Sequence, residues 1–179
     1  MNDAPSSMLG RAADLRFAFD RSFAMKRRAD TAASEDLLAI RLGSEAYALR
    51  LSEIAGLFAD KKITRVPGRN AGLLGIAGFR GAIVPVYDLQ TLLGATAMEV
   101  PRWLVIASAA PVAFAFDAFD GHLRIAHDAM LPQETGEHAR KYVREFLRMG
   151  SAVRPILHLP SILDAVMRQV SDESPREER

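Results

Sequence analysis

The chain has 179 residues, which suffices for one domain or for two small halves that share a core. Hydrophobic residues make up 49% and charged residues 25%, as in typical soluble globular proteins, and the net charge of +1 gives no general reason to expect nucleic acid as a partner. The chain contains no cysteine, which excludes disulfides and thiolate catalysis.

Residues 1–36 are predicted to form an extension in front of the folded domain. Over about residues 9–28, Leu15, Phe19 and Phe23 follow one helical stripe, and a segment of linker composition comes next. Such a helix covers a hydrophobic part of the domain or docks into a groove of a partner, and its acidic residues disfavour a membrane-surface helix. Since no signal peptide or apolar run of ~18 residues occurs, we expect a cytoplasmic protein without direct membrane insertion.

The folded domain is predicted to span residues 37–170 and to begin with a β-hairpin. Residues 38–42 alternate as a half-buried strand does, residues 43–45 form a turn, and residues 47–51 return as the partner strand.

A short helix and a short strand are expected after this hairpin. Ser52 can cap a helix that carries Ile54 and Leu57, and the residues from Ile63 to Val66 have the composition of a strand.

A glycine-rich turn that runs into a strand is the most distinctive stretch. Gly75, Gly78 and Gly81 flank Arg80, and residues 83–89 form an apolar run typical of a strand covered on both faces. A rigid turn loses little entropy when its arginine pairs with a carboxylate, which favours a role for Arg80 in protein binding. The alternative, a bridge from Arg80 to an internal acid, is compatible with that role.

The two halves of the domain, about residues 37–100 and 101–170, are similar to each other. At an offset of 70, residues 85–93 align with residues 155–163, and each segment has a strand entered through proline followed by a short amphipathic turn. Many short strands with Gly and Pro between them predict a mainly β fold of small barrels.

A helix and a charged tail are predicted to end the chain. Ser161 and Asp164 can form a capping box for a helix that reaches about Val170, and we expect residues 171–179 to be disordered.

No pattern of residues predicts catalysis, a metal or a cofactor. The histidines lack metal-ligand spacing, and the glycine spacing matches neither a P-loop nor a dinucleotide fingerprint. His158 ends an apolar strand, where a hydrogen-bonded structural role is expected. We therefore expect a protein that is not an enzyme and that acts through protein–protein interaction.

Several of these segments together resemble the CheW-like domain of bacterial chemosensory systems. The opening hairpin of residues 42–47, the glycine-rich stretch of residues 63–89, and the later segments 114–117 and 155–163 carry the resemblance, which covers about residues 37–168.

The resemblance implies two five-stranded β-barrel subdomains that share a hydrophobic seam, with short helices and a C-terminal helix. It also implies an adaptor or scaffold without a cofactor that binds the regulatory domain of the histidine kinase CheA and the cytoplasmic tip of chemoreceptors in receptor arrays. By position, the residues implied in partner binding are Ile54, Ile63, Gly75, Arg80 and Gly81.

The chain departs from the family pattern around this signature. Gly78 and Phe79 replace the usual Asn and Leu, and Gly56 takes the place of a usual Glu, so that either Glu53 pairs with Arg80 or Arg80 pairs with an acid of another protein. With its N-terminal helix, the chain has the features of a divergent adaptor. The alternatives are a regulatory module that docks through this helix onto another signalling enzyme, and a barrel that binds a small ligand in a closed apolar pocket.

Overall fold

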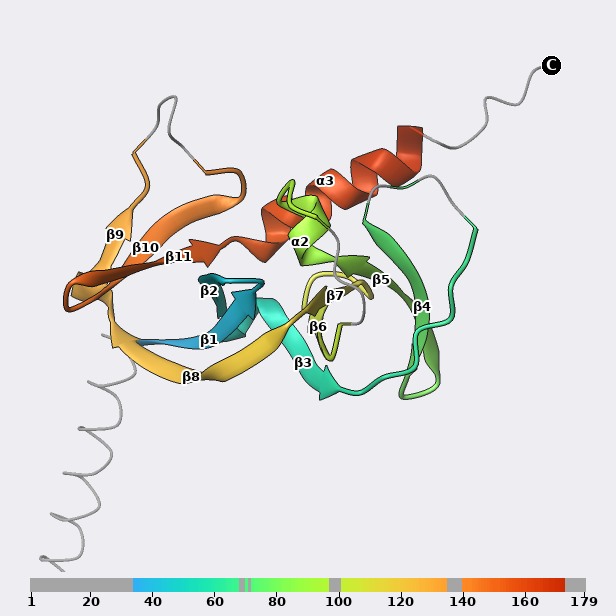
Figure 1. Cartoon of the computed structure of the whole chain (residues 1–179), viewed down its shortest axis with the longest axis horizontal. Coiled ribbons are helices and arrows are strands. Elements are labelled where there is room, and N and C mark those ends of the chain that lie inside the picture. The colour runs from blue at the N-terminus through green and yellow to red at the C-terminus, as the bar shows by residue number, and fades with distance from the viewer. Residues whose placement is uncertain (1–33, 68–69, 71, 97–100, 135–139, 173–179) are drawn as a thin grey trace, which may run out of the picture. The chain divides into compact units, whose positions relative to one another are not determined.

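The computed structural model describes residues 34–67, 70, 72–96, 101–134 and 140–172 (Figure 1). The chain divides into two compact units, Met1–Glu35 and Asp36–Arg179, and the second contains nearly all of the described residues. The expected N-terminal helix, with its docking residues Leu15, Phe19 and Phe23, lies outside them, and so does most of the expected tail.

Eleven strands form two sheets in the described part of the chain, which confirms the mainly β fold class. The first sheet has six strands in the order β8-β1-β2-β11-β10-β9, one more than expected. Its strands are β1 (Ser34–Leu42), β2 (Glu45–Arg50), β8 (Ala118–Ala126), β9 (Met130–Pro132), β10 (Val143–Met149) and β11 (Ala152–Leu157).

The second sheet has five strands in the order β3-β6-β7-β5-β4. Its strands are β3 (Ile54–Ala59), β4 (Leu73–Phe79), β5 (Ala82–Asp88), β6 (Trp103–Ala107) and β7 (Ala113–Phe116). The described helical segments are short except for the last, and they are η1 (Leu51–Glu53), α2 (Leu89–Leu92), η2 (His127–Ala129) and α3 (Leu159–Asp172). None of them is both long and apolar enough to cross a membrane.

Each sheet combines strands from both halves of the sequence repeat. The hairpin β1–β2 pairs in parallel with β11, where Ile156 lies opposite Ala48, and the hairpin β6–β7 pairs in parallel with β5, where Val86 lies opposite Ala113. Two parallel neighbouring strands need a long connection in the chain. Here each parallel pair joins a strand of one half to a strand of the other, so that both halves contribute to both sheets.

The segment after the first hairpin differs from the expectation. The prediction of a helix that carries Ile54 and Leu57 is wrong. A single 3₁₀ turn is followed at once by β3, which contains both residues and pairs antiparallel with β6. The expected strand from Ile63 to Val66 is reduced to one bridge, between Thr64 and Ile76.

One hydrophobic core joins the two sheets and the C-terminal helix, as the expected seam requires. Leu38, Ile40 and Leu49 enter it from the first sheet, Phe114 from the second, and Ile162 from α3. A smaller cluster fills the second sheet, where Phe79, Val84 and Val86 are buried and Phe58 and Ile63 pack against them. Burial of these aliphatic and aromatic side chains is the main stabilising contribution.

Candidate functional site

Arg80 and Gly81 form the two-residue turn between β4 and β5. Their φ angles are +48° and +86°, and the flanking residues Phe79 and Ala82 pair with each other. Positive φ at both central positions is the geometry that continues the right-handed twist of a hairpin, and glycine supplies it without strain at the second position. The glycine signal in the sequence therefore placed the turn correctly.

Arg80 is exposed at this tip, and it makes no hydrogen bond or ion pair within the described residues. Glu53, its candidate internal partner, is engaged elsewhere, since its carboxylate accepts a hydrogen bond from the Leu159 N–H at 2.9 Å. The same carboxylate lies 3.8 Å from His158 Nε2 and 4.0 Å from an Arg50 nitrogen. The position of Arg80 thus leaves its guanidinium accessible to an acid from outside.

Ile83 is an exposed apolar residue near the same tip. The expectation that residues 83–89 are covered on both faces is wrong at its first position, because Ile83 is 73% exposed while Val84 and Val86 are buried. Sequence reasoning missed this residue, since an aliphatic position in an apolar run carries no sign of its exposure. The tip consequently presents a cation and an aliphatic side chain together.

Gly75 and Ile63 lie where the segment after β3 meets β4. A Cβ on Gly75, whose φ is +145°, would lie 2.2 Å from the Thr64 carbonyl oxygen, so only glycine allows this approach. There the Thr64 N–H donates to the Ile76 carbonyl at 2.8 Å, and the Ile76 N–H donates back at 2.9 Å. Ile63 is partly buried against the core of the second sheet. Both residues hold the segment after β3 against β4.

Ile54 lies apart from this group. It begins β3 and packs against the main core, whereas the later residue Phe58 of the same strand contacts Phe79 beside the tip, with ring centroids 4.8 Å apart. Four residues of strand separate Ile54 from Phe58 by about 13 Å. Of the five expected binding residues, the structure therefore places Arg80 and Gly81 at the tip, Gly75 and Ile63 where the segment after β3 meets β4, and Ile54 at the start of β3.

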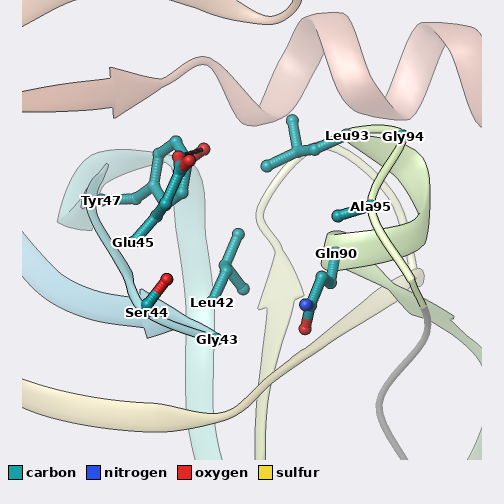
Figure 2. A pocket seen from close by; sticks show the side chains of 9 residues that line it. All are labelled: Leu42, Gly43, Ser44, Glu45, Tyr47, Gln90, Leu93, Gly94 and Ala95. Atoms are coloured by element: carbon teal, nitrogen blue, oxygen red, sulfur yellow. Dashed lines mark hydrogen bonds between the residues drawn. The ribbon is translucent and has the colours of Figure 1, made fainter.

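An open pocket of ≈ 280 Å³ lies between the β1–β2 turn and α2 (Figure 2). Tyr47 and Glu45 stand on one side, with the Tyr47 hydroxyl donating to the Glu45 carboxylate at 2.6 Å, and Gln90 and Leu93 stand on the other. Burial raises the pKa of Tyr47 to about 12, and the hydrogen bond to Glu45 adds to the increase. The residues that line it are Leu42, Gly43, Ser44, Glu45, Tyr47, Gln90, Leu93, Gly94 and Ala95. Because five of these nine are exposed and several are polar, this pocket differs from the closed apolar pocket that is expected of a ligand-binding barrel.

The aspartates at strand ends have structural partners. The buried carboxylate of Asp88 accepts hydrogen bonds from the Gln90 N–H at 3.0 Å and the Thr91 hydroxyl at 2.7 Å, which caps α2, and Asp117 accepts from the Gly43 N–H. Among the residues that the structure describes, no three His, Asp or Glu side chains gather as a metal site would require.

A sequence profile of the CheW-like domain matches residues 36–167. The chain belongs to the CheW-like domain family. A solved structure similar to it is that of the scaffolding protein TtCheW from Thermoanaerobacter tengcongensis, with a TM-score of 0.62 and 19% sequence identity over 69% of this chain and 88% of that chain. This similarity shows the fold, and a comparison with curated proteins gave no match.

Membership in the CheW-like family confirms the resemblance of the sequence and nearly the same range of residues. It supports a scaffold or adaptor kind of role in chemotaxis, since the proteins of this family are scaffolds and not enzymes. The hairpin tip of this CheW-like domain is its most distinctive candidate for a contact with a partner.

Proposed function

We propose that this CheW-like protein is a non-enzymatic chemosensory adaptor that couples chemoreceptors to a CheA-type histidine kinase. It acts in the cytoplasm, at membrane-bound receptor arrays, and binds the regulatory domain of the kinase and the cytoplasmic tip of the receptor. The observation that carries the proposal is the Arg80 tip of a CheW-like domain, where an arginine without a partner among the described residues stands near an exposed isoleucine.

The chemistry of the tip is suited to a protein partner. A turn fixed by two positive φ angles holds Arg80 in place, so that pairing with a carboxylate costs little conformational entropy. Burial of Ile83 would supply apolar contact beside this ion pair, and a desolvated centre with polar surroundings is the usual composition of an interface.

Reversal of the charge at Arg80 tests the proposal. We expect Arg80→Glu to weaken binding to the regulatory domain of a CheA-type kinase from the source organism by about 2 kcal/mol or more, as measured by calorimetry, because the carboxylate of the partner then meets a like charge. Arg168→Glu, on the exposed face of α3, is the matched control and should bind as the wild type does. Equal affinities of the two variants would contradict the role of Arg80, and a wild type that binds neither kinase nor receptor fragment would contradict the function.

Deletion of residues 1–33 separates the adaptor from the regulatory module that docks through its N-terminal helix. The deletion leaves β1 intact, since this strand begins at Ser34. An adaptor that binds through the Arg80 tip should still bind the kinase domain, whereas a module that docks through its helix should lose its partner.

A further inference from the structure

Cationic side chains line the segment that runs along the edge of β4 and the Arg80 tip at the end of that strand. Lys61, Lys62 and Arg65 follow β3 directly, and all three are exposed, as Arg80 is. We call these four residues, Lys61, Lys62, Arg65 and Arg80, the basic rim.

The segment that carries the rim runs along the outer edge of β4. Thr64 is bonded to Ile76 of that strand by two backbone hydrogen bonds, and Ile63 packs into the core of the sheet. Figure 1 shows the chain passing from the end of β3 beside the β4–β5 hairpin. The two stretches of the rim, which lie apart in the sequence, are therefore fixed next to each other by backbone pairing.

Aromatic rings hold one of these cations in place. The Lys61 ammonium lies 5.5 Å from the ring centroid of Phe58 and 5.7 Å from that of Phe79, the residue that precedes Arg80. An ammonium within ~6 Å of an aromatic face is attracted by the ring quadrupole. Lys61 is thus positioned beside the tip before any partner binds.

Few acidic residues balance the rim. In residues 54–67 and 72–88 the acids are Asp60 and Asp88. Asp88 is fully buried, and Asp60 pairs with Arg102, whose Nε lies 3.2 Å from the Asp60 carboxylate. The described surface at this end of the second sheet is consequently positive, although the whole chain has a net charge of only +1.

We propose that the basic rim is an interaction surface for an acidic face of a partner protein, with Ile83 as the apolar contact at its side. This inference rests on the proposed function, and it names the chemistry of the partner that docks at Arg80. Four cations along this edge, with one exposed aliphatic residue near its tip, match an Asp- or Glu-rich surface with an apolar spot. Such complementarity accelerates association more than it slows dissociation.

The exposed isoleucine favours a protein over other polyanions. A phosphate backbone offers no apolar surface that would cover Ile83, and a single aliphatic side chain gives little apolar area for insertion into a bilayer. Nucleic acid and lipid are therefore the competing outcomes of the test.

The test reverses the charges of Lys62 and Arg65 and leaves Arg80 and the ring-stacked Lys61 unchanged. We expect Lys62→Glu/Arg65→Glu to bind the kinase regulatory domain about tenfold more weakly than wild type at low salt, chiefly through a slower association rate, and to lose less affinity than wild type as salt is added. Arg148→Glu/Arg168→Glu changes the net charge equally at exposed positions elsewhere and should bind as wild type does. Thermal melting checks that all variants are folded, and stopped-flow fluorescence gives the rates.

Each outcome decides the inference. If the two double variants bind the kinase domain equally well, the rim is not an interaction surface, although the proposed function stands. If the wild type fails to bind the kinase domain, a fluorescent oligoglutamate peptide is the probe, and the rim then stands only if its reversal alone abolishes peptide binding. A larger loss on phosphatidylglycerol vesicles or on duplex DNA than on the peptide overturns the inference.

Discussion

Gly75 illustrates how a single residue combines two possible roles. The family resemblance implies it in partner binding, but the structure gives it a reason of its own, because the Thr64 backbone passes where a side chain would begin. The neighbouring glycine of the same strand, Gly78, has nothing within 4 Å of a Cβ. Two glycines in one strand therefore have different physical requirements.

We predict that Gly75→Ala destabilises the fold by about 2 kcal/mol or more, because the new Cβ needs both a rare φ and displacement of the Thr64 carbonyl. Gly78→Ala, the matched control in the same strand, should stay within about 1 kcal/mol of wild type. Urea denaturation followed by circular dichroism measures both. If the two variants are equally stable, the close approach to Thr64 is not what requires glycine at position 75.

At the scale of single elements, local patterns predicted the hairpins and non-local contacts decided the rest. The turn at Arg80 and Gly81 was predictable because positive φ angles leave a glycine signal in the sequence. β3 was missed because its pairing partner β6 comes about fifty residues later, and because a register shift between Ile54 and Gly56 lets Ile54 and Leu57 pack against the same core in a strand despite their helical spacing. The exposure of Ile83 and the stacking of Lys61 on Phe79 likewise depend on contacts that no short pattern contains.

The start of α3 shows the same difference between local and non-local signals. The helix begins at Leu159, two residues before the capping box expected at Ser161, and ends at Asp172. His158 takes the capping position, where its Nδ1 accepts a hydrogen bond from the Ser161 N–H at 3.2 Å and lies 2.7 Å from the Ser161 hydroxyl. The expectation of a hydrogen-bonded, structural His158 is confirmed. The Glu53 carboxylate accepts a hydrogen bond from the Leu159 N–H and lies 3.8 Å from His158 Nε2.

The cap makes the stability of the protein depend on pH. Burial lowers the pKa of His158 below its usual 6.5, and the positive charges of Arg144 and Arg50 lower it further. The unfolded chain therefore takes up a proton near pH 6.5, whereas the folded chain does so only at lower pH. The free energy of unfolding should accordingly be at its full value above pH 6.5 and fall as the pH decreases from there through the lowered pKa of the folded state.

His158→Asn provides the comparison, since asparagine keeps a capping acceptor but does not titrate. Denaturation curves of both proteins between about pH 5 and about pH 8 should show that wild type loses stability relative to the variant on the acid side. The difference between the two proteins removes the contribution of the other histidines. A constant difference across this range would show that protonation of His158 is not linked to folding.

At the scale of the whole molecule, the internal repeat predicted two similar halves but not how they combine. The hairpins β4–β5 and β10–β11 come at the same place in each half, as the offset of 70 implies, yet β5 pairs in parallel with β7 of the second half and β11 pairs in parallel with β2 of the first half. A sequence repeat carries no information on which copy a strand pairs with. The shared core, with Ile40 and Leu49 from one half and Phe114 and Ile162 from the other, explains why this exchange is stable.

The exchange of strands predicts that neither half folds alone. A fragment of residues 37–100 keeps the hairpins β1–β2 and β4–β5 but lacks β11 and β7, the parallel partners of β2 and β5, and isolated hairpins are marginal in water. We expect the fragments 37–100 and 101–170 to show narrow amide dispersion in NMR spectra and no cooperative thermal transition when they are alone. Co-expressed, they should form a stable one-to-one complex with the spectrum of the intact domain, because the missing partners and the common core are then restored. Cooperative melting of either fragment by itself would mean that this half is an independent folding unit. The parallel pairings β2–β11 and β5–β7 would then connect two halves that are already folded and would not be required for their folding.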